Sequence, residues 1–304
     1  MFDVVSVGHF SIDSIFLPTR RTPFTVLGGS VAYVSLASRR LDAHAAVLSK
    51  VGGDFPEAYR WWLGQEGVDL SLVSKDEKAQ TTRFDLEYSS DLSTRILRLK
   101  TRAPMITADD VSGSFRAKAI HIAPIAGEVS YDVAEKLRSH AEILSLDPQG
   151  LVRSFEENGS VTEHTLTDRR ILEFVDIYRS SLNEIKVVTG MPDLSSAINA
   201  VRDRGVKIII VTLGAEGAAV SIEGAIHNVP ACKPQKFVDP TGAGDAFMGG
   251  FLSEYVRGKD CSWCSCVGSA QASIVVEGIG PTSLGDKEEI YRRAKELYEK
   301  EIKR

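Results

Sequence analysis

Short apolar runs that alternate with helix-sized amphipathic segments constrain the fold of this chain more than any other feature. The clearest run, residues 206–212, is almost continuously apolar, which is typical of a strand covered on both faces. Similar runs occupy residues 3–8, 45–49, 119–123 and 143–147, and helical patterns lie between them. This repeated strand–helix order predicts an α/β fold with a mainly parallel central sheet and helices on both faces.

Composition limits what such a chain can do. It has 304 residues, of which 43% are hydrophobic, and a formal net charge of −5, so we expect no general affinity for nucleic acid or for anionic membranes. The first residues lack a basic segment followed by an apolar run, and the longest apolar runs are too short to span a bilayer. We therefore expect a cytoplasmic protein. No linker or repeat divides the chain, so residues 1–304 are expected to form one domain.

One hairpin interrupts the strand–helix order. Residues 82–88 alternate apolar and polar side chains, and residues 95–100 do so less cleanly after a polar turn, which predicts an antiparallel hairpin with one exposed face. Residues 11–27 read as irregular. We expect a small, discontinuous β lid formed by about residues 11–28 and 80–102. An exposed lid sheet can pair with a second copy, which makes a homodimer through the lid a hypothesis.

The stretch Gly242-Ala243-Gly244-Asp245 opens a segment with helical periodicity near the end of the chain. Glycines let a backbone approach a ligand closely. A helix start offers unpaired N–H groups and the positive end of the macrodipole, and both suit a phosphate group. Because a carboxylate beside an anion site repels the anion, Asp245 indicates proton transfer rather than binding.

Other candidates follow strands of the N-terminal half. Asp13 lies just past the first strand, where ligands bind in open α/β sheets, although capping of a turn explains it equally well. Gly28 and Gly29 precede a helix that carries Tyr33, and either a ligand contact or a tight turn explains them. Arg83 lies on the polar side of the hairpin, either as a solvated side chain or as a substrate contact.

Two further clusters have simple structural explanations. Glu184 begins a helix, so capping and the helix macrodipole account for it as well as a metal would. Cys261, Cys264 and Cys266 lie close together in the sequence, and Cys232 lies apart. Without a second Cys-x-x-Cys pair, small buried hydrophobic residues are favoured over a zinc site.

Together these residues resemble the ribokinase-like (PfkB) carbohydrate kinase family over essentially the whole chain. Residues 239–247 resemble its second signature, and Gly28-Gly29 with the following helix resembles the first. Residues 50–54 and 212–217 fall where the family has matching features, and the hairpin occupies the place of the family's lid. The resemblance implies a ribokinase-like fold and an ATP-dependent phosphotransferase.

The resemblance also implies a role for each matching residue. Asp245 would be the base that takes a proton from the substrate hydroxyl. The anion hole for the transferring phosphoryl group would be formed by the N–H groups around Gly242, Ala243 and Gly244. The substrate would be held by Asp13, Gly28, Gly29, Tyr33, Arg83 and Gln149. The nucleotide would be held by Thr212, Gly214, Gly217 and Thr241. Glu184 would organise Mg²⁺, largely through water, and the backbone oxygens of Asp239 and Thr241 would suit a monovalent cation such as K⁺.

Two positions depart from the family pattern. Ser181 stands where the Asn of the Asn-x-x-Glu motif is usual, and Tyr33 stands where the first signature often has a substrate-binding Asn. The second departure disfavours a furanose held as in ribokinase and favours a different sugar or polyol. Our leading hypothesis is therefore an ATP- and Mg²⁺-dependent kinase that acts on a hydroxyl of a small sugar or of a cyclic, inositol-like polyol.

Two other functions remain open. A nucleoside kinase of the same fold would need a surface for the base, for which Phe10, Phe16, Tyr33 and Phe84 are candidates. A non-catalytic sugar or nucleotide sensor belongs to another functional class, and the retained Asp245 argues against it.

Overall fold

The computed structural model of the chain describes residues 1–18, 20–90, 95–111 and 113–302. Within these ranges, one large sheet has the strand order β15-β14-β13-β12-β9-β8-β1-β4-β5. Its strands are β1 (Phe2–Val7), β4 (Ala45–Gly52), β5 (Val73–Asp76), β8 (Ala117–Ile122), β9 (Ala141–Leu146), β12 (Ile177–Ser181), β13 (Ile208–Thr212), β14 (Ala218–Ile222) and β15 (Ala225–Val229). The strands from β13 to β5 pair in parallel, and only β14 and β15 at one edge are antiparallel. The expected α/β fold with a mainly parallel sheet is confirmed.

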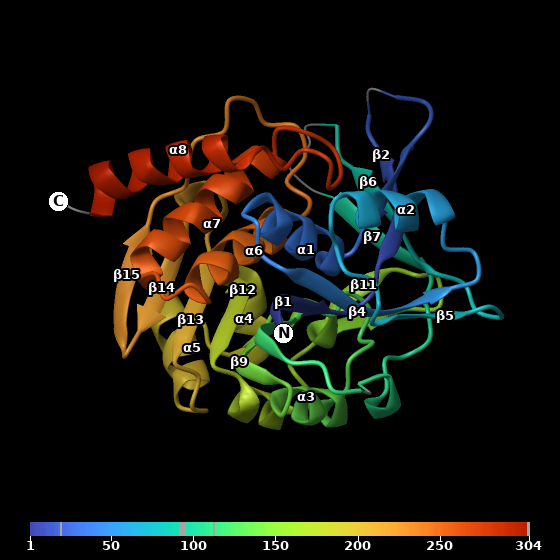
Figure 1. Ribbon diagram of the computed structural model, residues 1–304, viewed down its shortest axis with the longest axis horizontal. Helices are drawn as coiled ribbons and strands as arrows, with labels where there is room; N and C mark the ends of the chain where they lie inside the picture. Colours follow the sequence, from blue (N-terminus) through green and yellow to red (C-terminus); the bar gives the residue numbers. More distant parts are fainter. Residues whose placement is uncertain (19, 91–94, 112, 303–304) are drawn as a thin grey trace.

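Helices cover both faces of this sheet (Figure 1). One face carries α1 (Ser30–Arg40), α6 (Ala243–Tyr255), α7 (Cys261–Val275) and α8 (Lys287–Leu297), with α2 (Glu57–Gln65) packed beside α1. The other face carries α3 (Tyr131–Arg138), α4 (Leu182–Thr189) and α5 (Leu194–Arg202). The short 3-10 turns are η1 (Ala108–Asp110), η2 (Gln149–Val152), η3 (Arg169–Phe174) and η4 (Gly214–Glu216). The last element, η5 (Tyr298–Ile302), is π-helical and follows α8.

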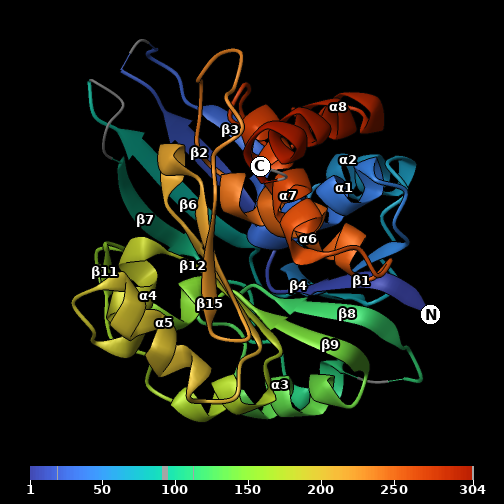
Figure 2. The ribbon, with the colours of Figure 1, turned by 90° about the vertical axis from the view of Figure 1, so that its left-hand side faces the viewer.

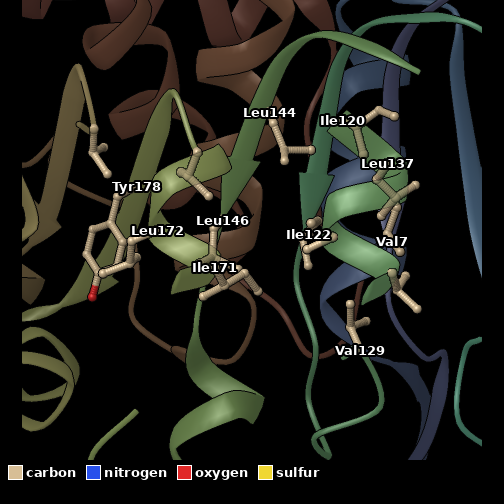
Figure 3. Packing of buried hydrophobic residues seen from close by; sticks show 14 of the residues in the cluster. Val7, Ile120, Ile122, Val129, Leu137, Leu144, Leu146, Ile171, Leu172 and Tyr178 are labelled. Atoms are coloured by element: carbon tan, nitrogen blue, oxygen red, sulfur yellow. The ribbon is translucent and has the colours of Figure 1, made fainter. Parts of the chain in front are cut away.

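The two-residue period of the strands divides their side chains between two cores. In β13, Ile209 and Val211 enter the core under α3, α4 and α5, whereas Ile208 and Ile210 enter the core under α6 and α7. Figure 3 shows part of the first core, in which side chains from β1, β8, β9 and β12 meet those of α3 and η3. Burial on both faces explains why these strands read as continuous apolar runs.

The chain reverses its direction of travel across the sheet beside β1. After β1 it builds β4 and β5 on one side, and it then returns to build β8, β9, β12 and β13 on the other. In an open α/β sheet, a reversal of this kind leaves a crevice at the carboxyl ends of the strands, where ligands bind. The sheet topology therefore places a candidate site at the carboxyl ends of β1 and β8.

A second, four-stranded sheet has the order β3-β2-β6-β7. It consists of β2 (Ser11–Phe16), β3 (Phe24–Gly28), β6 (Thr82–Tyr88) and β7 (Arg95–Thr101), which fall within the two segments expected for the lid. Figure 2 shows these strands gathered to one side of the central sheet. The expected antiparallel hairpin of β6 and β7 is confirmed. The expectation that residues 11–27 are irregular is wrong, because β2 and β3 pair with each other and β2 also pairs with β6.

The outer face of the lid is mainly polar, although Ile96 and Phe16 are exposed on it beside Glu87. Asp85 pairs with Lys100 at 3.7 Å, and Glu87 pairs with Arg98 at 2.8 Å. The inner face carries the apolar side chains of the lid, which form a core of their own with Ile125 and Ala126. An antiparallel sheet tolerates one open face when that face is polar, so the lid does not need a partner to cover it. A homodimer through the lid stays a prediction.

Two further elements have no counterpart among the expected ones, namely the edge strand β5 and the hairpin of β10 (Arg153–Phe155) and β11 (Val161–Glu163). Two cysteines of α7, Cys264 and Cys266, are buried in the core, whereas Cys261 is half-buried. No helix in the described ranges has the length and apolar character needed to cross a membrane.

Candidate active site

The turn that begins α6 is shaped by two close contacts. Gly242 has φ 80°, a left-handed conformation that favours glycine. A Cβ atom at this position would also overlap the ring of Tyr33. The N–H of Ala243 donates to the carbonyl of Pro240 at 3.2 Å, whereas no acceptor among the described residues receives the N–H groups of Gly242 or Gly244. The turn therefore offers the N–H groups of its two glycines to an anion, and the expected contribution of Ala243 is already used inside the turn.

Asp245 lies in the first turn of α6 with one carboxylate oxygen, Oδ1, shielded from solvent and without a hydrogen-bond partner. Burial, followed by the charge of Asp147, raises the pKa of Asp245 to about 6, although the Arg179 guanidinium and a hydrogen bond from Ser30 act in the opposite direction. A base with a pKa just below neutrality is ionised at pH 7 and still binds a proton readily. The expected proton acceptor thus has the environment that general-base chemistry requires.

A first cavity lies beside Asp245 and has a volume of about 70 Å³. Its polar lining comes from Ser11, Asp13, Ser30, Gln149, Arg153, Thr241 and Asp245, with the backbone of Gly29 and Gly242. Its apolar lining comes from Tyr33, Phe84, Leu86, Leu97 and Ile125. We call this space the acceptor pocket, after the substrate hydroxyl that Asp245 is expected to deprotonate.

Two glycines of the N-terminal half shape this pocket. A Cβ atom at Gly28 would overlap the carboxylate of Asp13, and one at Gly29, where φ is 90°, would overlap the backbone of His9. Asp13 itself lies on β2 rather than in a loop and is buried, with 6% of its surface exposed. The glycine pair therefore allows the start of α1 to pack directly on the strand that carries Asp13.

A second cavity, of about 510 Å³, lies on the other side of the α6 turn. The expected nucleotide-binding residues Thr212, Gly214 and Gly217 line it. Its remaining lining is largely apolar and includes Ala231, Cys232, Pro234, Phe237, Pro240, Phe247, Ala272 and Val276. An apolar cavity of this size can enclose a purine ring, and we call it the donor pocket. Thr241, expected in this group, lines the acceptor pocket instead.

A cleft of about 610 Å³ shares lining residues with both pockets. Gly242, Ala243, Gly244 and Asp245 form one wall, and Glu184 lies among the other lining residues. Oε2 of Glu184 accepts the N–H of Ser181 at 2.8 Å in a capping box, so both the capping role and the exposure to the cleft hold for this residue.

The carboxylate of Glu184 fits the expected Mg²⁺ site. Mg²⁺ keeps several waters and is bound in proteins through one or two carboxylates together with substrate phosphates. Glu184 supplies one such group to the cleft, and no set of three metal-ligating side chains competes for the ion among the described residues. When bound, the ion would neutralise charge on the donor phosphates.

Asp239 joins the α6 turn to the lid. Its Oδ1 accepts the N–H of Thr241 at 2.9 Å and the hydroxyl of Tyr88, a lid residue, at 2.6 Å. Its Oδ2 is buried without a hydrogen-bond partner. The side chain of Asp239 therefore holds the turn in place, and its second oxygen leaves capacity for one further ligand.

The structure does not bring every expected residue to the site. Arg83 lies on the outer side of the lid and pairs with Asp54 at 2.8 Å, away from the lining of the acceptor pocket. Of the aromatic candidates for a base, Phe84 and Tyr33 line this pocket, whereas Phe10 packs on Phe55 in the core.

Sequence reasoning missed two arginines at the site. Arg153, on the unexpected β10–β11 hairpin, lines the acceptor pocket and the cleft, and no local pattern marks it. Arg179 lines the cleft and the donor pocket. The available signal for Arg179 was its charge within a segment, residues 176–179, that the sequence predicts to be a strand.

The chain is similar to known proteins over nearly its whole length. The family described as pfkB family carbohydrate kinase matches residues 1–288. A cytidine kinase of Thermococcus kodakarensis is 29% identical over 93% of this chain and 99% of its own length. An inositol 3-kinase of Oryza sativa is 27% identical over 98% of this chain and 74% of its own length. The crystal structure of a nucleoside kinase of Methanocaldococcus jannaschii, a member of the ribokinase family, superimposes with a TM-score of 0.79 at 25% identity and covers 97% of this chain and 99% of its own. The chain therefore belongs to the pfkB family of carbohydrate kinases and is a phosphotransferase that acts on a hydroxyl group.

Proposed function

We propose that this enzyme is a nucleoside kinase, which transfers the γ-phosphoryl group of ATP to a hydroxyl of the nucleoside's sugar. The observation that carries the proposal is the two-sided lining of the acceptor pocket. Ser11 and Asp13 of the lid strand β2, with Ser30 of α1, supply its polar side, and the lid strands β6 and β7 supply its apolar side. A nucleoside has the same division, because its sugar is hydroxylated and its base has two apolar faces.

The apolar side argues against a polyol as the preferred acceptor. Phe84, Leu86 and Leu97 come from the inner face of the lid, and Ile125 follows β8. A cyclic polyol carries hydroxyl groups around its whole ring, so some of them would be buried against these side chains without partners, at about 1–3 kcal/mol each. A base ring would instead gain dispersion contacts there, and Gln149 and Arg153 can donate hydrogen bonds to its polar edge.

Phosphoryl transfer then follows from the positions of the chain's own groups. Oδ1 of Asp245 takes the proton of the acceptor hydroxyl as the hydroxyl oxygen attacks the γ-phosphorus of ATP. The bond from that phosphorus to the bridging oxygen breaks, and ADP leaves with the bond's electron pair. The N–H groups of Gly242 and Gly244 stabilise the transferring group, and a donor of this kind is typically worth about 100- to 1,000-fold in rate.

A cyclic polyol is the second candidate acceptor, as the sequence first suggested. The small volume of the acceptor pocket, about 70 Å³, and its cluster of hydroxyl and carboxylate groups support it. The similarity to a plant inositol 3-kinase supports it as well. A polyol would place hydroxyl groups against the apolar side of the pocket, where a nucleoside would place its base.

A panel of acceptors assayed by ADP release separates the two. Cytidine, uridine, adenosine, guanosine, myo-inositol, ribose and fructose are each supplied with ATP and Mg²⁺, and Asp245→Asn serves as the inactive control. We expect kcat/KM for at least one nucleoside to exceed the values for myo-inositol and for both free sugars by about 100-fold or more. A higher value for myo-inositol or a free sugar than for every nucleoside would overturn the proposal.

We also propose that a monovalent cation supports the α6 turn. The buried Oδ2 of Asp239 has no hydrogen-bond partner, and leaving a carboxylate oxygen in that state is costly unless a cation or water meets it. Activity in K⁺ is expected to exceed activity in choline at equal ionic strength. Equal rates in the two salts would remove the cation from the mechanism.

A further inference from the structure

Arg179 is a charged side chain on a strand that is otherwise buried. It is the third residue of β12, and only 6% of its surface is exposed. Tyr178 points into the core under α3, α4 and α5, so the two-residue period of the strand directs Arg179 to the opposite face, toward α6. Removing a guanidinium from water costs several kcal/mol unless neighbouring groups compensate, so its position calls for an explanation.

Its contacts place the guanidinium against the α6 turn. Nη1 donates to Oδ2 of the buried Asp147, and Nη2 donates to Oγ1 of Thr212 at 3.0 Å. A Cβ atom on Gly244 would overlap Nη2, Nη1 and the carbon between them. The second glycine of the Gly-Ala-Gly-Asp stretch is therefore required, in this chain, by the arginine that lies on it.

The guanidinium still has donor capacity in the buried state. A guanidinium carries five N–H groups in a planar fork, and the buried Nε of Arg179 has no hydrogen-bond partner among the residues that the structure describes. A buried N–H that lacks a partner costs about 1–3 kcal/mol. A ligand with oxygen acceptors that enters this space would remove that cost.

The side chains around Arg179 carry a net negative charge. The carboxylates of Asp147, Glu184 and Asp245 all act on the guanidinium, and among the described residues Asp147 forms an ion pair with it. Arg179 is thus a fixed cation inside an acidic cluster that must accept a polyphosphate. A positive charge held at that point lowers the repulsion that the incoming phosphates would otherwise meet.

Arg179 also lies at the junction between the donor pocket and the cleft. It lines the donor pocket together with Thr212, and it lines the cleft together with Gly244 and Asp245. A phosphoryl group that passes from the donor to a hydroxyl at Asp245 crosses this junction. We propose that Arg179 is a further catalytic residue, which binds the terminal phosphoryl group of the donor and stabilises its charge during transfer.

The proposal deepens the proposed function, but it rests on the kinase activity and not on the identity of the acceptor. It is therefore tested first by donor binding, which needs no acceptor. Calorimetry compares a non-hydrolysable ATP analogue, AMP-PNP, with AMP, which lacks the terminal phosphates. For Arg179→Met we expect the affinity for AMP-PNP to fall about tenfold or more, with the affinity for AMP changed less than twofold.

Kinetics give the second measurement, with whichever acceptor of the panel is turned over. Arg179→Met is expected to lower kcat by about 100- to 1,000-fold, the range for loss of a preorganised donor at a developing charge. The matched control is Arg293→Met. Arg293 is equally buried and pairs with Glu277 and Glu289, so this variant removes a buried, paired arginine that does not line the acceptor pocket, the donor pocket or the cleft. Its kcat should stay within threefold of the wild-type value.

Arg179→Met leaves Asp147 buried without its partner, which can prevent folding. A second variant is therefore needed. The double variant Arg179→Met, Asp147→Asn removes both charges, and Asp147→Asn alone keeps the cation. We expect the double variant to lose affinity for AMP-PNP and the single Asp147→Asn variant to retain it. If folded Arg179→Met or the double variant binds AMP-PNP as the wild type does, Arg179 is only a structural partner of Asp147 and the proposal is wrong.

Discussion

The hydroxyl of Tyr88 in the lid donates to Oδ1 of Asp239 at 2.6 Å, which joins the lid directly to the turn at the start of α6. The same carboxylate oxygen accepts the N–H of Thr241, the residue directly before Gly242, at 2.9 Å. The lid is therefore joined to the turn at the start of α6 through this carboxylate, and the Tyr88 hydroxyl also lies 3.2 Å from the hydroxyl of Thr241.

Removing the Tyr88 hydroxyl should weaken this closure. A hydrogen bond to a charged group is worth about 1.5–3 kcal/mol, so we expect Tyr88→Phe to lower kcat/KM for the acceptor about tenfold or more, while the KM for ATP changes little. Steady-state kinetics with each substrate varied in turn measure both values. Tyr291→Phe, which removes a hydroxyl bonded to Glu254 away from the site, should leave both unchanged. An unaltered acceptor kcat/KM in Tyr88→Phe would contradict a role for the contact in closure.

The rate should depend on the ionisation of Asp245. Because burial raises its pKa to about 6 and only the carboxylate can accept a proton, kcat/KM should fall tenfold per pH unit below about pH 6. The Arg179 guanidinium lowers this pKa, so Arg179→Gln should move the acid limb to higher pH. A pH profile of each enzyme between pH 4.5 and 8.5 tests both statements, and a limb at the same pH in the two enzymes would show that Arg179 and Asp245 are not coupled.

The ionised side chain of Asp245 should also destabilise the folded protein at neutral pH. Its folded pKa of about 6 lies above its ordinary value of 3.8, so the folded state binds the proton more tightly than the unfolded state does. The resulting stabilisation is full below pH 3.8 and is lost as the pH rises through about 6. Asp245→Asn should therefore gain stability relative to the wild type between pH 4 and pH 8, by at most about 3 kcal/mol. Urea unfolding at both pH values measures the difference, and a constant difference would rule out the raised pKa.

Gly244 should tolerate no side chain. A Cβ atom there overlaps the Arg179 guanidinium, so Gly244→Ala should lower both kcat and stability, the latter by about 1–3 kcal/mol as for other overpacked sites. Gly64→Ala in α2 is the control, because a Cβ atom at Gly64 meets nothing within 4 Å, and this change should stabilise the helix by about 0.5–1 kcal/mol. In the background Arg179→Ala, Asp147→Asn, which lacks the guanidinium and leaves no buried unpaired carboxylate, Gly244→Ala should cost little stability, and activity should stay low. A loss of stability in that background as large as in the wild type would place the strain of Gly244→Ala elsewhere.

The sequence predicted those parts of the fold and site that depend on local pattern. The parallel strands are continuous apolar runs because both of their faces are buried, and the α6 turn is marked by its glycines and by Asp245. Residues 11–28 were expected in the lid, but their strands β2 and β3 were not recognised, because β2 takes part of its pairing from the distant residues of β6. No period within residues 11–27 reports such a partner.

The missed and misplaced site residues have a similar cause. Arg179 is recognisable only once β12 is known to lie between β9 and β13, with its guanidinium against Gly244. Arg83 was assigned to the substrate from its place in the hairpin, but its neighbours Thr82 and Phe84 are the buried residues of β6. The alternation of the strand shows that Arg83 and its neighbours lie on opposite faces of the sheet. Which of the two faces lines the acceptor pocket follows only from how the lid packs.

The parallel pairing of β2 with β6 has a consequence for the order in which the molecule matures. These strands lie on either side of the segment that contains α1, β4, α2 and β5, so the lid sheet can assemble only after that segment has folded and returned the chain to β2. Contacts between residues so far apart in sequence form slowly. The acceptor pocket takes its lining from the lid and from the α6 turn, so it is complete only after these long-range contacts have formed. Recognition of the acceptor is thus a property of the finished molecule that no single segment of the chain carries by itself.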